Sequence, residues 1–158
     1  MGPSGSGKSA VGAAIAATLG IPFVDGDDLH SAANVEKMLA GSPLDDEDRM
    51  PWLDAVGRVL RAAPDIVVAC SALARRYRER IAQTATDAVF VELAVETDEL
   101  RRRMRRRDHF MPPALLDSQL AAWERLAPDE PGFSLHNEGT VQEVAARAAA
   151  RLADQFLR

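Results

Sequence analysis

The chain has 158 residues, the size of one domain, and its hydrophobic share of 47% and charged share of 27% exclude a disordered or fibrous protein. A net charge of −5 argues against nucleic acid as the main partner, because phosphate backbones require a broadly positive surface. The single cysteine, Cys70, excludes an internal disulfide, and no apolar run resembles a membrane span or a signal peptide, so we expect a cytoplasmic protein with no membrane partner.

Short β-branched runs alternate with longer helical segments, which is the pattern of an α/β fold around a parallel sheet. A first helix is predicted over residues 8–19, where apolar residues recur at helical spacing before Gly20. Four buried strands are predicted, at residues 21–24, 66–70, 88–95 and 133–136. Asp48 is predicted to cap a central helix, and a last helix is predicted over residues 141–156. One domain with a single core is therefore expected over residues 1–158.

A glycine-rich segment with the pattern G-x-x-x-x-G-K-[ST] runs directly into the first predicted helix. Its glycines allow backbone N–H groups to turn around phosphate oxygens, and the helix N-terminus adds partial positive charge. Lys8 is predicted to act in catalysis by reaching the β- and γ-phosphates, and Ser9 to ligate the Mg²⁺ that bridges them. The alternative, a flexible turn, leaves this context unexplained. The predicted ATP-binding residues are Gly2, Pro3, Ser4, Gly5, Ser6, Gly7, Lys8 and Ser9.

Two carboxylates, Asp25 and Asp27, follow the strand predicted at residues 21–24. In extended chain two such residues point to the same side, and ligands of open α/β sheets bind at this edge. One carboxylate can support magnesium while the other accepts the proton of a hydroxyl group. An ordinary Asp-Gly turn is the alternative interpretation.

Three basic side chains follow within a short stretch: His30, Lys37 and Arg49. Their chemistry suits a small polyhydroxylated anion, because an arginine fork grips a carboxylate with two hydrogen bonds and His or Lys can bond hydroxyl groups. Taken singly, each residue is more typical of a solvated surface.

Several blocks resemble those of gluconate kinases in the shikimate-kinase-like group of P-loop kinases, over essentially the whole chain. The blocks are residues 2–9 (G-x-S-G-S-G-K-S), 23–30 (D-G-D-x-L-H), 34–38 (N-x-x-K-M), 43–53 (P-L-x-D-x-D-R-x-P-W-L), 70–78 (C-S-A-L-x-x-x-Y-R) and 109–119 (H-F-M-P-x-x-L-L-x-S-Q). Their combination is far more selective than the phosphate-binding loop alone.

The resemblance implies phosphorylation of D-gluconate by ATP to 6-phosphogluconate, in a three-layer α/β/α P-loop NTPase fold with a small helical lid at about residues 101–119. It also implies a homodimer. On this resemblance Asp27 handles the acceptor hydroxyl and Asp25 supports magnesium. The implied substrate contacts are Arg49 and Arg78 as carboxylate clamps, with His30, Lys37, His109 and Gln119 as further candidates.

Two features depart from the family pattern. Six arginines lie between Arg101 and Arg107, and we predict that Arg103 and Arg107, which share a helical face, contact the phosphates during catalysis. Only Met1 precedes the phosphate-binding loop, which ordinarily follows a strand. We therefore expect that about five to ten upstream residues belong to the working protein, or that another segment fills that place in the sheet.

Other functions remain open. A kinase for another small hydroxy acid, such as shikimate, is disfavoured by the R-x-P-W-L block. An arginine-rich nucleic-acid-binding P-loop protein is disfavoured by the acidic balance and by the absence of aromatic residues beside the arginine run. A nucleotide-binding regulator without turnover is disfavoured by the paired carboxylates.

Overall fold

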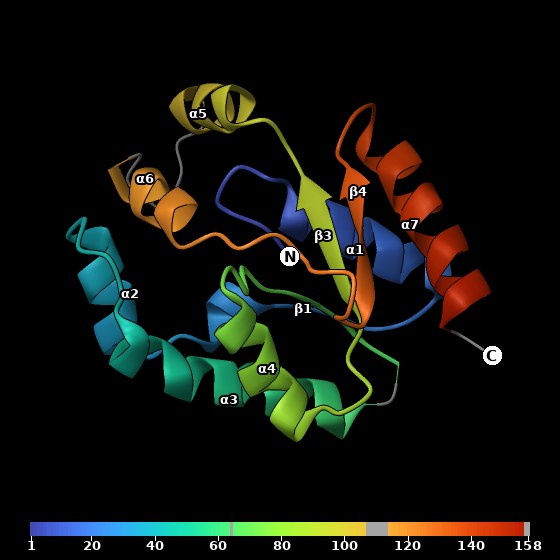
Figure 1. Ribbon diagram of the computed structural model, residues 1–158, viewed down its shortest axis with the longest axis horizontal. Coiled ribbons are helices and arrows are strands. Elements are labelled where there is room, and N and C mark those ends of the chain that lie inside the picture. The colour runs from blue at the N-terminus through green and yellow to red at the C-terminus, as the bar shows by residue number, and fades with distance from the viewer. Residues whose placement is uncertain (64, 107–113, 157–158) are drawn as a thin grey trace.

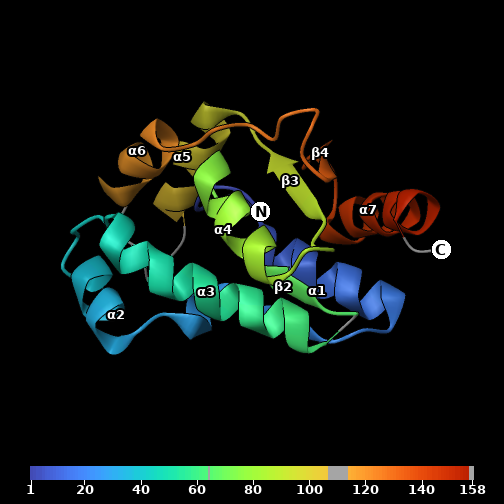
Figure 2. The same ribbon diagram turned by 60° about the horizontal axis from the view of Figure 1, so that its bottom comes forward.

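The computed structural model describes residues 1–63, 65–106 and 114–156. Its strands lie between two helical layers (Figures 1 and 2). Helices α1 (Lys8–Leu19) and α7 (Val141–Gln155) pack together on one face, and α3 (Asp46–Ala62) and α4 (Arg75–Thr84) on the other. This arrangement confirms the predicted three-layer α/β/α fold.

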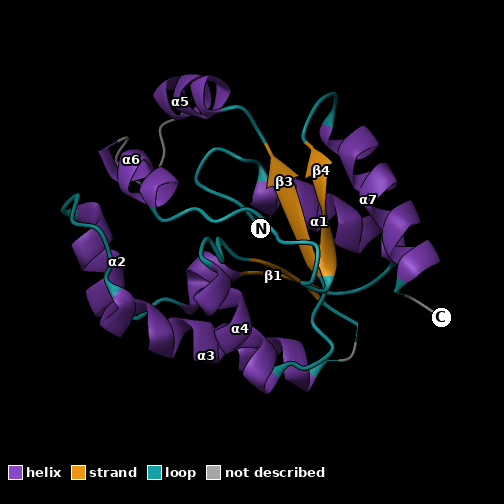
Figure 3. Ribbon diagram, in the orientation of Figure 1, coloured by secondary structure: helices purple, strands orange, loops and turns teal. Residues whose placement is uncertain are grey.

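All four predicted strands form, and they are arranged in two parallel pairs (Figure 3). One pair joins β1 (Phe23–Asp25) to β2 (Val67–Ala69), and the other joins β3 (Phe90–Ala94) to β4 (Gly132–His136). Gly132 lies opposite Phe90 with φ +153°, and a Cβ there would lie 2.0 Å from the Phe90 carbonyl oxygen. Only glycine allows this close approach of the two strands.

Two apolar clusters hold the helical layers against the strands. One contains Trp52 and Leu53 of α3 with Ile81 of α4, and the other contains Val11 of α1 with Val144 of α7. Burying each large aliphatic side chain contributes about 1.5 to 3 kcal/mol. The clusters therefore fix the helices that begin beside the strand ends. None of the helices in the described ranges is both long and apolar enough to cross a membrane.

Helix α3 begins earlier than the sequence predicts. Asp45, and not Asp48, is its N-cap: the Asp45 carboxylate accepts a hydrogen bond of 3.0 Å from the Asp48 N–H, and the Asp48 carboxylate accepts one from the Asp45 N–H. This reciprocal capping box satisfies two N–H groups, so it outcompetes a cap by Asp48 alone. The earlier start places Arg49 inside the first turns of α3.

The remaining helices gather beyond the carboxyl ends of the strands (Figure 1). They are the 3₁₀ helix η1 (Gly26–Leu29), α2 (Ala32–Leu39), α5 (Thr97–Arg106) and α6 (Ala114–Ala121). Helices α5 and α6 fall within or beside the segment predicted as a lid, and the connection between them lies outside the described residues.

A cavity of about 910 Å³ separates the two strand pairs, lined by β2, β3 and residues of α1, α3, α4 and α7. Met1 enters its edge, where the Met1 amino group donates to the Val91 carbonyl at 2.5 Å and the Leu93 N–H donates to the Met1 carbonyl at 2.9 Å. Burial lowers the pKa of this amino group to about 6. The lining of this cavity is mainly apolar, so we interpret it as a gap in the core and not as a ligand site, although it is larger than the pocket beside the phosphate-binding loop. The expectation that a further strand fills it stays a prediction.

An apolar extension of about six residues, joined ahead of Met1, is expected to raise the Tm by about 5 to 10 °C, because about 1 kcal/mol of added stability shifts the midpoint of a domain this size by about 2 to 4 °C. The extension would pair with β2 and β3 and bury its side chains in the cavity. Differential scanning calorimetry measures the shift, with a Gly/Ser extension of equal length as control. Equal Tm values for both extensions would contradict the prediction.

Candidate active site

The phosphate-binding loop leads into the N-terminus of α1. Gly7 is the N-cap with φ +88°, and a Cβ there would lie 2.7 Å from the Asn137 amide nitrogen, so both backbone and space require glycine. Within the described ranges, the buried Ser6 hydroxyl oxygen has no hydrogen-bond partner. An unsatisfied hydroxyl beside a helix N-terminus fits a loop that binds anionic phosphate groups.

Asn137 anchors this loop from the end of β4, and sequence reasoning missed it. Its side-chain amide donates to the Ser6 carbonyl at 2.6 Å, and its N–H donates to the Ala94 carbonyl at the end of β3 at 3.0 Å. Asn137 could have been predicted from its position, because it directly follows a parallel strand. The same rule identified Asp25 and Asp27.

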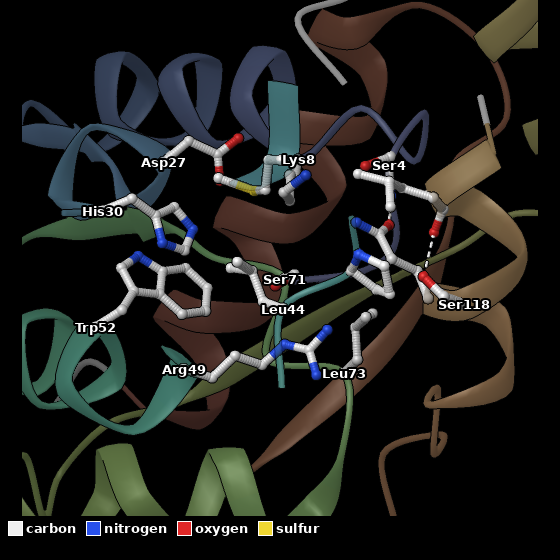
Figure 4. A pocket seen from close by; sticks show the side chains of 14 residues that line it. Ser4, Lys8, Asp27, His30, Leu44, Arg49, Trp52, Ser71, Leu73 and Ser118 are labelled. Carbon is white, nitrogen blue, oxygen red and sulfur yellow. Dashed lines mark hydrogen bonds between the residues drawn. The ribbon is translucent and has the colours of Figure 1, made fainter. Parts of the chain in front are cut away.

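A pocket beside the loop brings together six of the predicted site residues (Figure 4). They are Ser4, Lys8, Asp27, His30, Arg49 and Gln119. Residues from η1, α3, α6 and the segment after β2 complete its wall. The pocket therefore combines two cationic side chains, one carboxylate and several neutral polar groups, as an anionic polyol requires.

The two carboxylates are not arranged as the sequence suggests. The chain leaves the strand at Asp25 and enters η1, so Asp27 lies on a 3₁₀ helix and the extended geometry assumed for the pair is wrong. The Asp25 carboxylate caps η1 by accepting from the Asp27 N–H at 3.1 Å. Asp27 lines the pocket, and Asp25 is the residue that holds η1 in place.

His30 lies flat against Trp52, with ring centroids 4.2 Å apart and an angle of 14° between the planes (Figure 4). The Trp52 indole donates to the Gly26 carbonyl at 2.7 Å, which fixes the ring against η1. Burial lowers the pKa of His30, although the nearby Asp27 carboxylate opposes that change, so the imidazole is neutral near pH 7. Trp52 is a site residue, but the sequence analysis included it only as part of a block that resembles the family and predicted no role for it in the site.

Arg49 extends from α3 into the pocket (Figure 4). Its Nη1 donates to the Tyr77 hydroxyl at 2.9 Å. Among the residues that the structure describes, no carboxylate forms a salt bridge with it. A guanidinium held at one nitrogen, and not paired with a carboxylate of the described residues, is suited to bind an anionic ligand.

Arg78 does not line this pocket. Its side chain is 1% exposed and pairs with Glu130, with Nε 2.5 Å from Oε2, while Nη1 donates to the carbonyls of Ala72 and Leu73 at 3.1 Å each. Ala72 has φ +41°, a strained conformation for a residue with a side chain. Arg78 thus stabilises the turn that forms the pocket wall, and its predicted role as a direct clamp does not fit this geometry.

Lys37 also lies outside the pocket. Its ammonium group pairs with Asp48 and, at 3.3 Å, with Asp45, so it joins α2 to the N-terminal turn of α3. The ion pair with Lys37 lowers the pKa of Asp48. A lysine engaged by two carboxylates is poorly placed to bind a substrate hydroxyl.

Helices α5 and α6, from the segment predicted to form a lid, both contact the phosphate-binding loop. Arg103 of α5 lies with Nη1 3.4 Å from the Gly5 carbonyl oxygen and Nε 2.8 Å from Glu99. Gln119 of α6 accepts a hydrogen bond of 2.7 Å from the Ser4 N–H. Arg107 and His109 lie outside the described residues.

The chain was compared with known families and proteins. The shikimate kinase family matches residues 4–157. A gluconokinase of Gluconobacter oxydans is 45% identical over 143 residues, covering 87% of this chain and 80% of that protein. The thermosensitive gluconokinase of Escherichia coli is 44% identical over 135 residues, covering 82% of this chain and 72% of that protein.

A solved structure agrees with these sequence matches. The crystal structure of a gluconokinase from Sinorhizobium meliloti has a TM-score of 0.89 and 42% identity, and covers 99% of this chain and 90% of that one. Because sequence identity and fold agree over nearly the whole chain, the protein belongs to the shikimate kinase family and groups within it with the gluconokinases.

Proposed function

We propose that the protein transfers the γ-phosphoryl group of ATP to D-gluconate, giving 6-phospho-D-gluconate and ADP. The observation that carries this proposal is the pocket in which Lys8, Asp27 and Arg49 meet beside the phosphate-binding loop. The gluconokinase relatives support the same substrate.

The loop supplies the nucleotide half of the reaction. Its backbone N–H groups and the N-terminus of α1 bind the phosphates, and Lys8 stabilises charge that develops on the transferred group. The hydroxyl chemistry of Ser9 and the carboxylate chemistry of Asp25 fit Mg²⁺, which prefers oxygen ligands and water. When bound, Mg²⁺ would neutralise charge on the β- and γ-phosphates.

Asp27 and Arg49 supply the acceptor half. Asp27 takes the proton from the attacking hydroxyl group, and Arg49 binds the carboxylate at the other end of the sugar acid. His30 and Gln119 line the same pocket and would bond the intervening hydroxyl groups. Holding the substrate at both ends aligns one hydroxyl with the phosphoryl group.

Helices α5 and α6 act as a lid in this proposal. The pocket beneath them has a volume of about 40 Å³, room for about three water molecules. In this proposal the binding of a six-carbon acid is accompanied by movement of α6, which supplies Leu115, Ser118 and Gln119 to the pocket wall. Arg103, together with Arg107 and His109 beyond the described residues, then closes over the bound phosphates and substrate.

The arginine run does not favour the nucleic-acid alternative. Arg101 pairs with Asp117 at 3.2 Å, and Glu99 pairs with both Arg102 and Arg103. These two carboxylates engage three of the arginines and offset part of the local positive charge that a phosphate backbone would require. We propose a cytoplasmic homodimer that acts on a small molecule, consistent with the acidic composition and the family resemblance.

A coupled assay of ADP release across a panel of sugar acids tests the proposed reaction. We expect turnover with D-gluconate, dependence on added Mg²⁺, and little turnover with shikimate. Equal turnover with shikimate, or none with any sugar acid, would reject D-gluconate as the substrate.

The Arg49→Lys variant is expected to raise the gluconate KM by about 10- to 100-fold with little change in the ATP KM. An ammonium group cannot reproduce the bidentate bonds of a guanidinium, and a charged hydrogen bond is worth about 1.5 to 3 kcal/mol. Steady-state kinetics measure both constants. Arg58→Lys, on an exposed part of the same helix, is the matched control. An unchanged gluconate KM would move the carboxylate clamp elsewhere.

A further inference from the structure

A hydrogen-bonded network lies behind Arg49, outside the pocket itself. The buried Tyr77 of α4 donates its hydroxyl hydrogen to Asp46 at 2.5 Å and accepts from Arg49 Nη1 at 2.9 Å. Arg76 Nη2 donates to the same hydroxyl oxygen at 3.1 Å and, through Nε, to Asp46 at 3.0 Å. The hydroxyl group therefore uses its one donor and both acceptor positions.

The network constrains the direction of the Arg49 side chain. Asp46 and Arg49 are three residues apart and share a face of α3, and the Tyr77 hydroxyl bridges them from α4. Because Asp46 takes the hydroxyl hydrogen, the lone pairs of the oxygen face the guanidinium group. Arg49 Nη1 is held there, and the Nε and Nη2 edge is the one that remains for a ligand.

The packing of Tyr77 does not by itself explain the hydroxyl. The ring belongs to the apolar cluster of α3 and α4 and is 2% exposed, and a phenylalanine ring would fill the same space. The hydroxyl group reaches past this cluster to three charged residues, of which only Arg49 lines the pocket. Asp46 and Arg76 are each about half exposed, so the network adds little to the core.

We propose that Tyr77, oriented by Asp46, is a positioning residue that holds the Arg49 guanidinium in the geometry that recognises the substrate carboxylate. This inference rests on the proposed function of Arg49 as the clamp. Tyr77 makes no contact with substrate, and its effect passes through Arg49. It therefore sets the affinity and selectivity for acids without acting on the transferred phosphoryl group.

The Tyr77→Phe variant tests this role, because it keeps the ring and removes the hydroxyl. The expected result is a gluconate KM raised by about 5- to 20-fold, with kcat and the ATP KM within about two-fold of the parent protein. Asp46→Ala, a change at a half-exposed position, is expected to raise the same KM by about two- to five-fold. Arg80→Lys is the matched control, because Arg80 pairs with Asp54 across the same two helices but outside this network, and it is expected to leave the gluconate KM within about two-fold.

A double-mutant cycle separates positioning from a merely structural role. When Arg49 is already lysine, adding Tyr77→Phe is expected to change the gluconate KM by less than about two-fold, because the guanidinium that Tyr77 holds is absent. Fully additive effects would overturn the inference, as would equal losses in kcat and both KM values. If Arg49→Lys raises the KM and Tyr77→Phe does not, only the positioning role fails; if Arg49→Lys has no effect, the clamp itself fails.

Discussion

Replacing Lys8 by alanine is expected to lower kcat by about 10²- to 10³-fold, the usual effect of removing one preorganised donor to a developing negative charge. Lys8 begins α1 and lines the pocket at the point where the loop, η1 and the acceptor site meet. It is half-buried and forms no salt bridge with a described residue, so the fold does not depend on its charge. Rapid-quench or coupled kinetics measure kcat, and the Tm checks the fold.

The matched control is Lys37→Ala, since Lys37 is the other lysine of the chain and lies outside the pocket. We expect kcat of this variant to stay within about three-fold of the parent. A near-normal kcat for Lys8→Ala, with an unchanged Tm, would contradict the assignment of the loop as the catalytic phosphate site.

The Asp27→Asn variant is expected to lower kcat by about 10²- to 10⁴-fold while ATP affinity changes by less than about five-fold. The amide keeps the shape of the side chain but cannot accept the proton of the attacking hydroxyl group. Asp27 is suited to this role because η1 directs it into the pocket while Asp25 caps that helix. Titration calorimetry with ATP and steady-state kinetics separate binding from turnover.

Asp28→Asn is the control for Asp27, because Asp28 is the next residue of η1, is exposed and does not line the pocket. It is expected to behave as the parent protein. If Asp27→Asn abolishes ATP affinity and kcat persists, Asp27 belongs to the metal site and not to the acceptor.

The nucleotide half of the site was predictable because its information is local. The loop is one contiguous segment, its glycines are required by the backbone, and the helix after it spans Lys8–Leu19 as the periodicity predicts. The strands were predictable for the same reason, since each is a short apolar run. The exception was Asp25 and Asp27, because a 3₁₀ helix begins at Gly26 and is capped by the Asp25 carboxylate, so the two residues do not share one extended strand.

The sequence by itself determined the phosphate-binding loop, the α/β fold and the family, whereas only the tertiary structure decided which polar side chains face the pocket. Arg49 and Arg78 lie in equally recognisable blocks, but Arg78 is buried against Glu130, 52 positions away, and Arg49 faces the pocket. Likewise Tyr77 and Asn137 act through contacts with α3 and with the loop. The physical reason is that an arginine carries the same charge in any sequence. Its role depends on its neighbours, because the packing of distant elements decides which carboxylates and hydroxyls lie within hydrogen-bond distance.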